Sequence, residues 1–271
     1  MKTIALVPAA GLGTRLRDGR HKGPPCPKQY RRIGQQPIIS YTLRVMQECD
    51  EIDQIVVIVS AGEREFCERE ILPLCGLRKP YQVVIGGAQR QQSVYQGLAS
   101  VHNQLAQESQ GSQRSQGYQG YQGAQGYQGG QGCQDGADII VIHDAARPLI
   151  SVQLLRQSIF EARKCGACIV GVPVRDTLKR INEEGLIEET VCRSRLWMAQ
   201  TPQSFRFDIL WKAHQEALKD GFQGTDDSVL LERIGFAVKM IPGSVKNIKI
   251  TYPEDLEMAE EWLAEKGGQR G

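Results

Sequence analysis

Several features are absent from this sequence, and each absence excludes a class of protein. No apolar run approaches the roughly 20 residues that a transmembrane helix needs, so we expect no membrane partner. The formal net charge is only +2, which argues neither for nor against nucleic acid, and we expect no nucleic-acid partner. Met1 leads directly into an apolar segment, without the pattern of a signal peptide, so we expect a cytoplasmic location.

Cysteine spacing for a zinc site is also missing. The eight cysteines are scattered, and Cys165 and Cys168 form the one Cys-x-x-Cys pair. This pair falls where a predicted helix ends and a strand begins, whereas a thioredoxin-like motif opens a helix. We therefore interpret the cysteines as free thiols in a reducing compartment, and a redox pair is the less favoured alternative.

Two familiar nucleotide-binding fingerprints are absent as well. A P-loop needs Gly-x-x-x-x-Gly-Lys-Ser/Thr, which does not occur. A dinucleotide loop needs Gly-x-Gly-x-x-Gly and an acid at the end of the second strand. Here Leu16 stands at the third glycine, and the second predicted strand ends at Ser60. Both departures disfavour a dinucleotide oxidoreductase.

A glycine-rich turn is the most informative feature that is present. A predicted strand at residues 3–8 runs into Ala-Ala-Gly-Leu-Gly-Thr-Arg, and a Pro-Lys-Gln follows. Gly11 and Gly13 remove Cβ atoms where the backbone turns sharply and approaches a ligand. Backbone N–H groups at such a turn attract phosphate oxygens, and Arg15 and Lys28 add positive charge. The pattern predicts a nucleoside triphosphate site, with an ordinary tight turn as the alternative.

Strand-like and helix-like segments alternate along the 271 residues. The strands are apolar at consecutive positions, as expected for strands that are covered on both faces. This alternation predicts an α/β fold, a Rossmann-like and mostly parallel sheet with helices on both faces. We assign one domain to residues 1–265 and a flexible tail to residues 266–271. The predicted strands are residues 3–8, 54–60, 82–85, 138–142, 167–172 and 237–242, and the predicted helices are residues 38–48, 64–72, 90–101, 152–164, 207–219, 228–234 and 253–264.

Two segments interrupt this alternation. We interpret residues 104–136 as a disordered Gln/Gly/Tyr-rich insertion, because such a composition buries too little apolar surface to offset its ordering entropy. The alternative is a segment that associates with partner proteins. Residues 175–200 alternate about a turn at Gly185 and predict a projecting β-hairpin arm. Its apolar positions would be exposed to solvent unless another surface packs on them, and a second subunit in a homodimer would supply that surface. The alternative is a hairpin that folds back on its own sheet.

Polar residues follow the predicted strand at residues 138–142. Asp144 and Arg147 lie at the sheet edge where ligands bind in such folds. Asp144 could bind a divalent metal or a ribose hydroxyl, and Arg147 could bind a phosphate with two hydrogen bonds. An Asp–Arg pair that only holds the strand end is the alternative. His143 points to the opposite face in a regular strand, so we interpret it as structural. Lys249, taken alone, is most simply a solvated surface charge.

Seven motifs occur in one order along nearly the whole chain. They are Ala9-Ala10-Gly11-x-Gly13-x-Arg15, Pro27-Lys28-Gln29, His143-Asp144-Ala145-Ala146-Arg147-Pro148, Pro173-Val174-Arg175-Asp176-Thr177, Thr201-Pro202-Gln203, Thr225-Asp226-Asp227 and Asn247-Ile248-Lys249-Ile250-Thr251. In this combination the chain resembles the 2-C-methyl-D-erythritol 4-phosphate cytidylyltransferases of the non-mevalonate isoprenoid pathway. The stretch between Arg15 and Lys28 is longer than that family usually has, and we predict an extended mobile flap there.

The resemblance implies a nucleotidyltransferase. It would transfer CMP from CTP to 2-C-methyl-D-erythritol 4-phosphate, giving 4-diphosphocytidyl-2-C-methyl-D-erythritol and pyrophosphate. It implies Mg²⁺ as cofactor, bound mainly through the CTP phosphates, and a homodimer through the arm at residues 175–200. The alternatives are a cytidylyltransferase for another alditol phosphate such as ribitol 5-phosphate, a uridylyl- or guanylyltransferase for a sugar phosphate, and an interaction protein on an inactive enzyme domain.

By motif match, the resemblance also implies a role for each site residue. The catalytic residues are Arg15, Lys28 and Lys249. The nucleotide-binding residues are Ala9, Ala10, Gly11, Gly13, Gly86, Gly87, Ser93 and Asp144. The substrate-binding residues are Asp144, Arg147, Thr177, Arg193, Thr201, Thr225 and Lys249. Of these, Arg193, and with it Thr225, would reach the site of the partner subunit.

Overall fold

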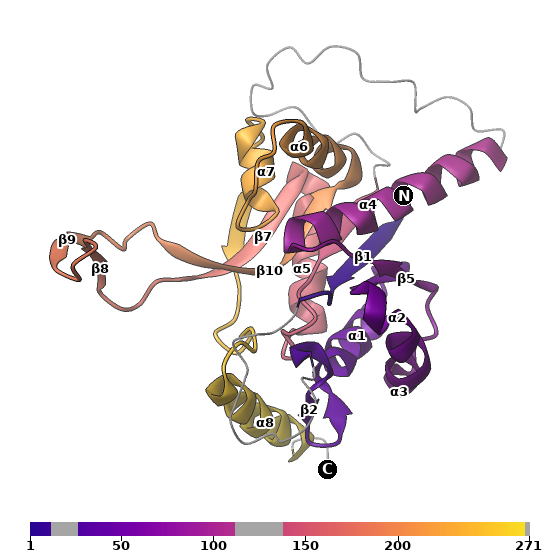
Figure 1. Ribbon diagram of the computed structural model, residues 1–271, viewed down its shortest axis with the longest axis horizontal. Coiled ribbons are helices and arrows are strands. Elements are labelled where there is room, and N and C mark those ends of the chain that lie inside the picture. The colour runs from indigo at the N-terminus through magenta and orange to yellow at the C-terminus, as the bar shows by residue number, and fades with distance from the viewer. Residues whose placement is uncertain (12–26, 112–137, 269–271) are drawn as a thin grey trace.

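A seven-stranded sheet forms the centre of the computed structural model, which describes residues 1–11, 27–111 and 138–268 (Figure 1). Its strands are β1 (Thr3–Pro8), β4 (Gln54–Val59), β5 (Tyr81–Ile85), β6 (Ile139–Ile142), β7 (Ala167–Pro173), β10 (Trp197–Arg206) and β11 (Lys239–Pro242). The order across the sheet is β11-β7-β10-β6-β1-β4-β5. β10 is antiparallel to both of its neighbours, and the other pairs are parallel. The predicted mostly parallel α/β sheet is confirmed.

Helices cover both faces of the sheet. On one face lie α1 (Ile38–Glu48) and α5 (Val152–Cys165), and on the other lie α4 (Arg90–Gly111), α6 (Phe207–Lys219) and α7 (Ser228–Arg233). Successive side chains of a strand point to opposite faces, so Ala5 and Val7 pack in the first core and Ile4 and Leu6 in the second. All four side chains are fully buried, which explains why the strands are apolar at consecutive positions.

Smaller elements surround this sheet. The 3₁₀ helix η2 (Lys28–Tyr30) precedes a small hairpin of β2 (Arg32–Ile33) and β3 (Gln36–Pro37), and a third apolar cluster joins this hairpin to α8 (Pro253–Gly268). The predicted helix at residues 64–72 is present and continues to Cys75, as three contiguous stretches of alternating helix type that follow the 3₁₀ turn η3 (Ala61–Glu63). They are α2 (Arg64–Phe66), the π-helical η4 (Cys67–Ile71) and α3 (Leu72–Cys75).

The sequence analysis missed β10, a strand in the middle of the sheet. Polar residues and Pro202 obscured it, because proline has no N–H for a central strand ladder. The structure resolves this conflict with a register shift between Gln200 and Gln203, so Pro202 lies at an irregularity of the β7–β10 ladder. Phe205 on the far side of the shift is fully buried in the core.

The helix that leads into the Gln/Gly/Tyr-rich segment is longer than predicted. We expected it to end near residue 101, but α4 continues to Gly111, so residues 104–111 of the supposed insertion are helical. Glutamine is a good helix former, and Gln104 exchanges two side-chain hydrogen bonds with Gln54 of β4. Helix α8 likewise continues to Gly268, into the predicted tail. The rest of the Gln/Gly/Tyr-rich segment, residues 112–137, lies outside the described residues.

The predicted hairpin at residues 175–200 is present. Strands β8 (Leu178–Ile181) and β9 (Ile187–Val191) pair antiparallel in a separate two-stranded sheet, with Gly185 at positive φ in the turn. Figure 1 shows this hairpin, which we call the arm, projecting from the body of the molecule between the end of β7 and the start of β10. Ile181, Leu186 and Ile187 are each more than half exposed at its tip.

Two further expectations concern membranes and cysteines. None of the helices in the described ranges is long and apolar enough to cross a membrane. Cys165 and Cys168 are both free thiols, and burial raises the pKa of Cys168 to about 12. A thiol with such a pKa stays protonated at neutral pH, which does not suit a redox pair.

Candidate active site

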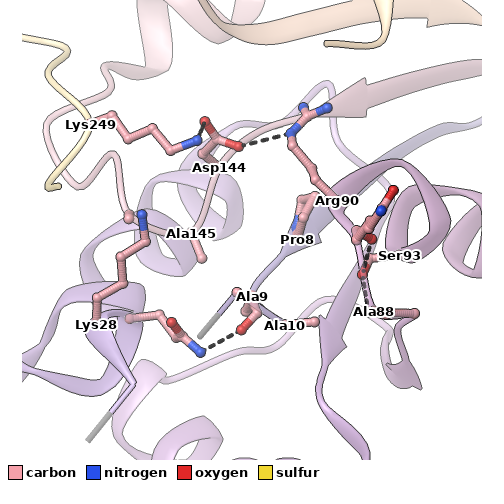
Figure 2. Close-up of a pocket in the computed structure, with 15 residues that line it drawn as sticks. Pro8, Ala9, Ala10, Lys28, Ala88, Arg90, Ser93, Asp144, Ala145 and Lys249 are labelled. Atoms are coloured by element: carbon pink, nitrogen blue, oxygen red, sulfur yellow. Dashed lines mark hydrogen bonds and ion pairs between the residues drawn. The ribbon is translucent and has the colours of Figure 1, made fainter. Parts of the chain in front are cut away.

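A pocket of about 310 Å³ lies at the edge of the sheet where β1 and β6 end (Figure 2). Pro8 ends β1 and residues 9–11 follow it, residues 144–146 follow β6, and residues 87–89 lie between β5 and Arg90, the first residue of α4. Parallel strands bring their carboxyl ends to one edge, so these three loops converge. Lys28 and Gln29 from η2, Ser93 from α4 and Lys249 from the segment before α8 complete the lining among the described residues.

The loop after β1 is held by three hydrogen bonds. The N–H of Ala9 donates to the carbonyl of Ile58 (2.7 Å), and the Ser60 hydroxyl donates to the carbonyl of Ala10 (3.1 Å). The buried Gln29 side chain donates to the carbonyl of Ala9 (2.5 Å). Gln29 therefore fixes this loop, a role that the sequence analysis did not assign although it quoted the Pro-Lys-Gln motif.

Gly86 and Gly87 bring a second loop close to the first. A Cβ on Gly86 would lie 2.6 Å from the Ser93 hydroxyl and 3.0 Å from the Ala10 Cβ, so a larger residue does not fit there. Gly87 and Ser93 line the pocket, and Gly86 packs directly behind them. Ala9, Ala10 and Gly11 also line it. The proposed nucleotide-binding residues within the described ranges are thus brought together.

Asp144 is the centre of a cluster of charged side chains. Lys249 Nζ lies 2.9 Å and Arg147 Nε 3.4 Å from its Oδ2, and Arg90 Nε lies 3.5 Å from its Oδ1. Burial raises the pKa of the Asp144 carboxyl, but Lys249, Arg90 and Arg147 outweigh burial and hold that pKa far below its usual range. Figure 2 shows Lys249 and Arg90 reaching Asp144 from opposite sides, with Lys28 facing the same space.

Lys249 is in this pocket because its segment is tied to the sheet. The amide of the fully buried Asn247 donates to the carbonyl of Thr201 (2.8 Å), and the N–H of Ile250 donates to the carbonyl of Ala146 (2.8 Å). Arg147 in turn donates to the carbonyl of Asn247 (2.7 Å). The interpretation of Lys249 as a solvated surface charge is therefore wrong, and Asn247 is a site residue that the sequence analysis missed.

The backbone of Asp144 is held by a buried network. Its N–H donates to the Thr201 hydroxyl (3.1 Å), whose oxygen lies 3.0 Å from Nδ1 of the fully buried His143. His143 Nε2 lies 3.2 Å from the carbonyl of Arg147, which can only accept, so we assign the proton to Nε2. Nδ1 is then the acceptor, and the Thr201 hydroxyl donates to it. The structural role expected for His143 thus includes holding Thr201 against the site.

This network predicts a pH dependence of stability. Burial lowers the pKa of His143 from 6.5 to about 4 in the folded protein. Between these values the unfolded chain binds a proton that the folded protein does not, so the free energy of unfolding falls as the pH falls. We expect a loss of roughly 3 kcal/mol from pH 6.5 to pH 4. Urea unfolding across this range should show a shallower pH slope for His143→Gln, and parallel curves for the two proteins would contradict the assignment.

The structure does not bring every predicted residue to this pocket. Thr177 and Arg193 are exposed on the arm, and Thr225 is exposed in the turn before α7. Within one chain, none of these three lines the pocket. Gly13 and Arg15 lie outside the described residues. The predicted flap at residues 16–27 does too, except for Pro27. Arg90 lines the pocket and was not predicted, although its place at the start of the helix after the Gly-Gly turn was a usable signal.

Comparison with known proteins identifies the family of this chain. The sequence model of the 2-C-methyl-D-erythritol 4-phosphate cytidylyltransferase family matches residues 3–108 and 124–265. The chain belongs to this family. Residues 109–123 are not matched by the family model, and they fall within the Gln/Gly/Tyr-rich segment.

Curated members and solved structures of the family agree along nearly the whole chain. The chain is 40% identical over 267 residues to the 2-C-methyl-D-erythritol 4-phosphate cytidylyltransferase of Syntrophotalea carbinolica, with 98% of each chain covered. It is 37% identical to that of Caldanaerobacter subterraneus, with 97% of this chain and 99% of the relative covered. The crystal structure of the 4-diphosphocytidyl-2C-methyl-D-erythritol synthase of Anaerococcus prevotii matches with a TM-score of 0.72 and 25% identity over 97% of this chain and 96% of that one.

Proposed function

We propose that the protein transfers CMP from CTP to 2-C-methyl-D-erythritol 4-phosphate and releases pyrophosphate. Membership of the cytidylyltransferase family supports this proposal over the alternative acceptors. The observation that carries it is the grouping of Lys28, Lys249 and Asp144 beside the glycine loop at the end of β1. These groups come from distant parts of the chain, yet they meet around a space suited to a triphosphate and an anionic acceptor.

The chemistry needs charge stabilisation more than a covalent nucleophile. A phosphate oxygen of the acceptor attacks the α-phosphorus of CTP in line, and the bond between that phosphorus and the oxygen that joins it to the β-phosphate breaks, so that this oxygen leaves with the pyrophosphate. The acceptor dianion is already nucleophilic, so the attack requires no base. Lys28 and Lys249 reduce the repulsion between the two anions and stabilise the charge that develops on the transferred group, with Arg15 as the third predicted cation.

Asp144 suits a positioning role in this scheme. Its two oxygens face Lys249 and Arg147 on one side and Arg90 on the other. It therefore holds three cations at fixed places, and one lone pair of Oδ1 remains for a ribose or acceptor hydroxyl. Arg147, which is 3.4 Å from Asp144 and largely buried, stands next to the acceptor site that we propose.

The donor set also bears on Mg²⁺. Within the described ranges, no group of three or more His, Cys, Asp or Glu side chains could hold a metal ion, and Asp144 is the only carboxylate that lines the pocket. Because cations already face both of its oxygens, it is a poor direct ligand. The residues fit an ion that arrives on the CTP phosphates, where it would neutralise phosphate charge. Lys28 and Lys249 would then contact phosphate oxygens that the ion leaves exposed.

We also propose a homodimer through the arm. The exposed Ile181, Leu186 and Ile187 need a cover, and a second copy of the chain supplies one. In such a dimer the arm residues Thr177 and Arg193 would complete the site of the partner. We place the enzyme in the cytoplasm, which suits the free thiols of the described cysteines.

Mixing two inactive variants tests the shared site. If Arg193 acts in the partner's site, Arg193→Ala and Lys249→Ala subunits form hybrid dimers in which one site carries both changes and the other carries neither. Random pairing of a 1:1 mixture should restore about a quarter of the wild-type activity. Co-expressed subunits with different tags allow the hybrid to be purified and assayed. Activity no higher than that of either parent would mean that Arg193 does not act in trans.

Product analysis tests the reaction itself. Purified protein is incubated with CTP, Mg²⁺ and 2-C-methyl-D-erythritol 4-phosphate, and the cytidine diphospho-alditol product is detected by mass. Parallel reactions contain UTP, GTP or ATP, or ribitol 5-phosphate as acceptor. We expect turnover to be fastest with CTP and the methylerythritol phosphate. Faster turnover with another pair would replace the proposed substrates, and no nucleotidyl product from any pair would reject the proposed function.

A further inference from the structure

A second carboxylate lies behind the pocket and outside its lining. Asp227, at the start of α7, is only 1% exposed. Its Oδ2 lies 2.7 Å from Arg90 Nη1, and its Oδ1 lies 3.4 Å from His214 Nε2 on α6. Burial raises the pKa of Asp227, but Arg90 and His214 together outweigh burial and lower that pKa, so the group stays ionised.

Arg90 connects this buried carboxylate to the site. Its guanidinium contacts Asp227 through Nη1 at 2.7 Å and Asp144 through Nε at 3.5 Å. The shorter contact is to the more deeply buried partner. Asp227 therefore anchors the guanidinium at Nη1, and Asp144 contacts it more weakly at Nε. Because the guanidinium is planar and rigid, contacts at two of its nitrogens fix its orientation.

The turn that carries Asp227 is itself attached to both sides of the site. Gln203 of β10 accepts the Asp227 N–H (3.1 Å) and donates to Asp226 (2.8 Å). Gln91, next to Arg90 on α4, donates to the carbonyl of Phe222 (2.9 Å) and accepts from the N–H of Gly224 (2.7 Å). The turn therefore cannot shift without moving the start of α4, which places Asp227 firmly relative to Arg90.

We propose that Asp227 and Arg90 are positioning residues that hold the Asp144 carboxylate where Lys249 and the substrates can use it. Asp227 keeps Arg90 from closing on Asp144 with two hydrogen bonds, which would compete with Lys249 for the same oxygens. In this arrangement Arg90 restrains one oxygen of Asp144 and leaves the other to Lys249 and Arg147. The inference rests on the proposed cytidylyl transfer, and it adds a role for a residue that does not line the pocket.

The test is a double-mutant cycle between Asp227 and Asp144. We expect Asp227→Asn to lower kcat/KM by up to about 10²-fold, the cost of a small displacement of a catalytic group. In an Asp144→Asn background the same change should have little further effect, because the carboxylate through which it acts is gone. Asp220→Asn is the matched control. It weakens the ion pair of Asp220 with Arg233 at the end of α7 but touches neither Arg90 nor the turn that carries Asp227, and kcat/KM should stay near wild type.

Each outcome decides between the claims. Wild-type protein without turnover would reject the proposed function, whereas active wild type with an Asp227→Asn variant of unchanged kcat/KM would reject only the positioning role. Equal losses from Asp227→Asn in both backgrounds would show that it does not act through Asp144. If Asp227→Asn does not fold, Arg90→Lys replaces it in the same cycle, since lysine keeps the charge but cannot bridge two carboxylates. The same criteria then apply to Arg90→Lys.

Discussion

Replacement of Lys249 by alanine is expected to lower turnover by about 10²–10³-fold, as for the loss of one preorganised donor. Lys249 Nζ lies 2.9 Å from Asp144 in a pocket that also contains Lys28. The protein should remain folded, because Arg90 and Arg147 still face the Asp144 carboxylate after the change. Lys28→Ala should have an effect of the same order, since Lys28 lines the other side of the same space.

The measurement is single-turnover CMP transfer at saturating CTP, so that the chemical step is separated from product release. Lys246→Ala provides a matched control. Lys246 lies three residues earlier in the same segment, but it is exposed, pairs with Glu265 and is not part of the pocket lining. Its replacement should leave turnover within about twofold of wild type. Near-normal turnover in both Lys28→Ala and Lys249→Ala would remove these residues from the mechanism.

Asp144→Asn is expected to damage both catalysis and stability. The change removes the one negative charge that lies among Arg90, Arg147 and Lys249, and Arg147 is only 11% exposed. Arg90 keeps its contact with Asp227, but Arg147 and Lys249 lose their carboxylate partner in a largely buried site, so the free energy of unfolding should fall by about 3–5 kcal/mol. Turnover of the folded protein should fall by about 10²-fold, because Arg147 and Lys249 lose their fixed positions.

Urea unfolding and CMP transfer measured on the same preparations check this prediction. Asp53→Asn is a suitable control, because Asp53 accepts a backbone N–H (from Thr3, 2.7 Å) with its carboxylate but lies at the opposite edge of the sheet, before β4. It should lower stability slightly and leave turnover unchanged. A folded Asp144→Asn variant with wild-type turnover would show that the carboxylate does not organise the site. Addition of inorganic pyrophosphate should restore part of the lost stability, because an anion can bind the uncompensated cations.

The elements that could be predicted from sequence are those whose evidence is local. Helices α1 and α6 begin and end at the predicted residues, because their apolar residues recur at helical spacing and their ends are marked nearby. β1 also has its predicted bounds, since its apolar run precedes the glycine turn. β10 was missed because its place depends on a neighbour. Its polar residues and Pro202 make a poor strand in isolation, but residues 197–200 and 203–206 pair once β6 and β7 lie beside them, and Pro202 falls in the register shift between the two paired parts.

The same distinction holds within the site. Lys28, the Ala9–Gly11 turn and Asp144 could be assigned from motifs, because each stands directly beside a strand or turn that signals its place. Gln29 and Asn247 could not, because what matters in each is a contact with a residue elsewhere in the chain, such as the 2.8 Å hydrogen bond from Asn247 to Thr201. No local pattern records such a contact.

By itself, the sequence determined the family, the alternation of strands and helices, and which loops carry glycines and charges beside the ends of strands. The alternation and the positions of the loops follow from the short-range rules of backbone geometry and apolar spacing, whereas the family follows from the resemblance of seven motifs in one order. Only the tertiary structure decided that Lys249 faces a pocket and not solvent, that His143 supports Thr201, and that a buried aspartate behind the pocket holds Arg90. These facts depend on electrostatic and hydrogen-bond contacts over a few ångströms between segments that are far apart in the chain, and chain folding alone sets those distances.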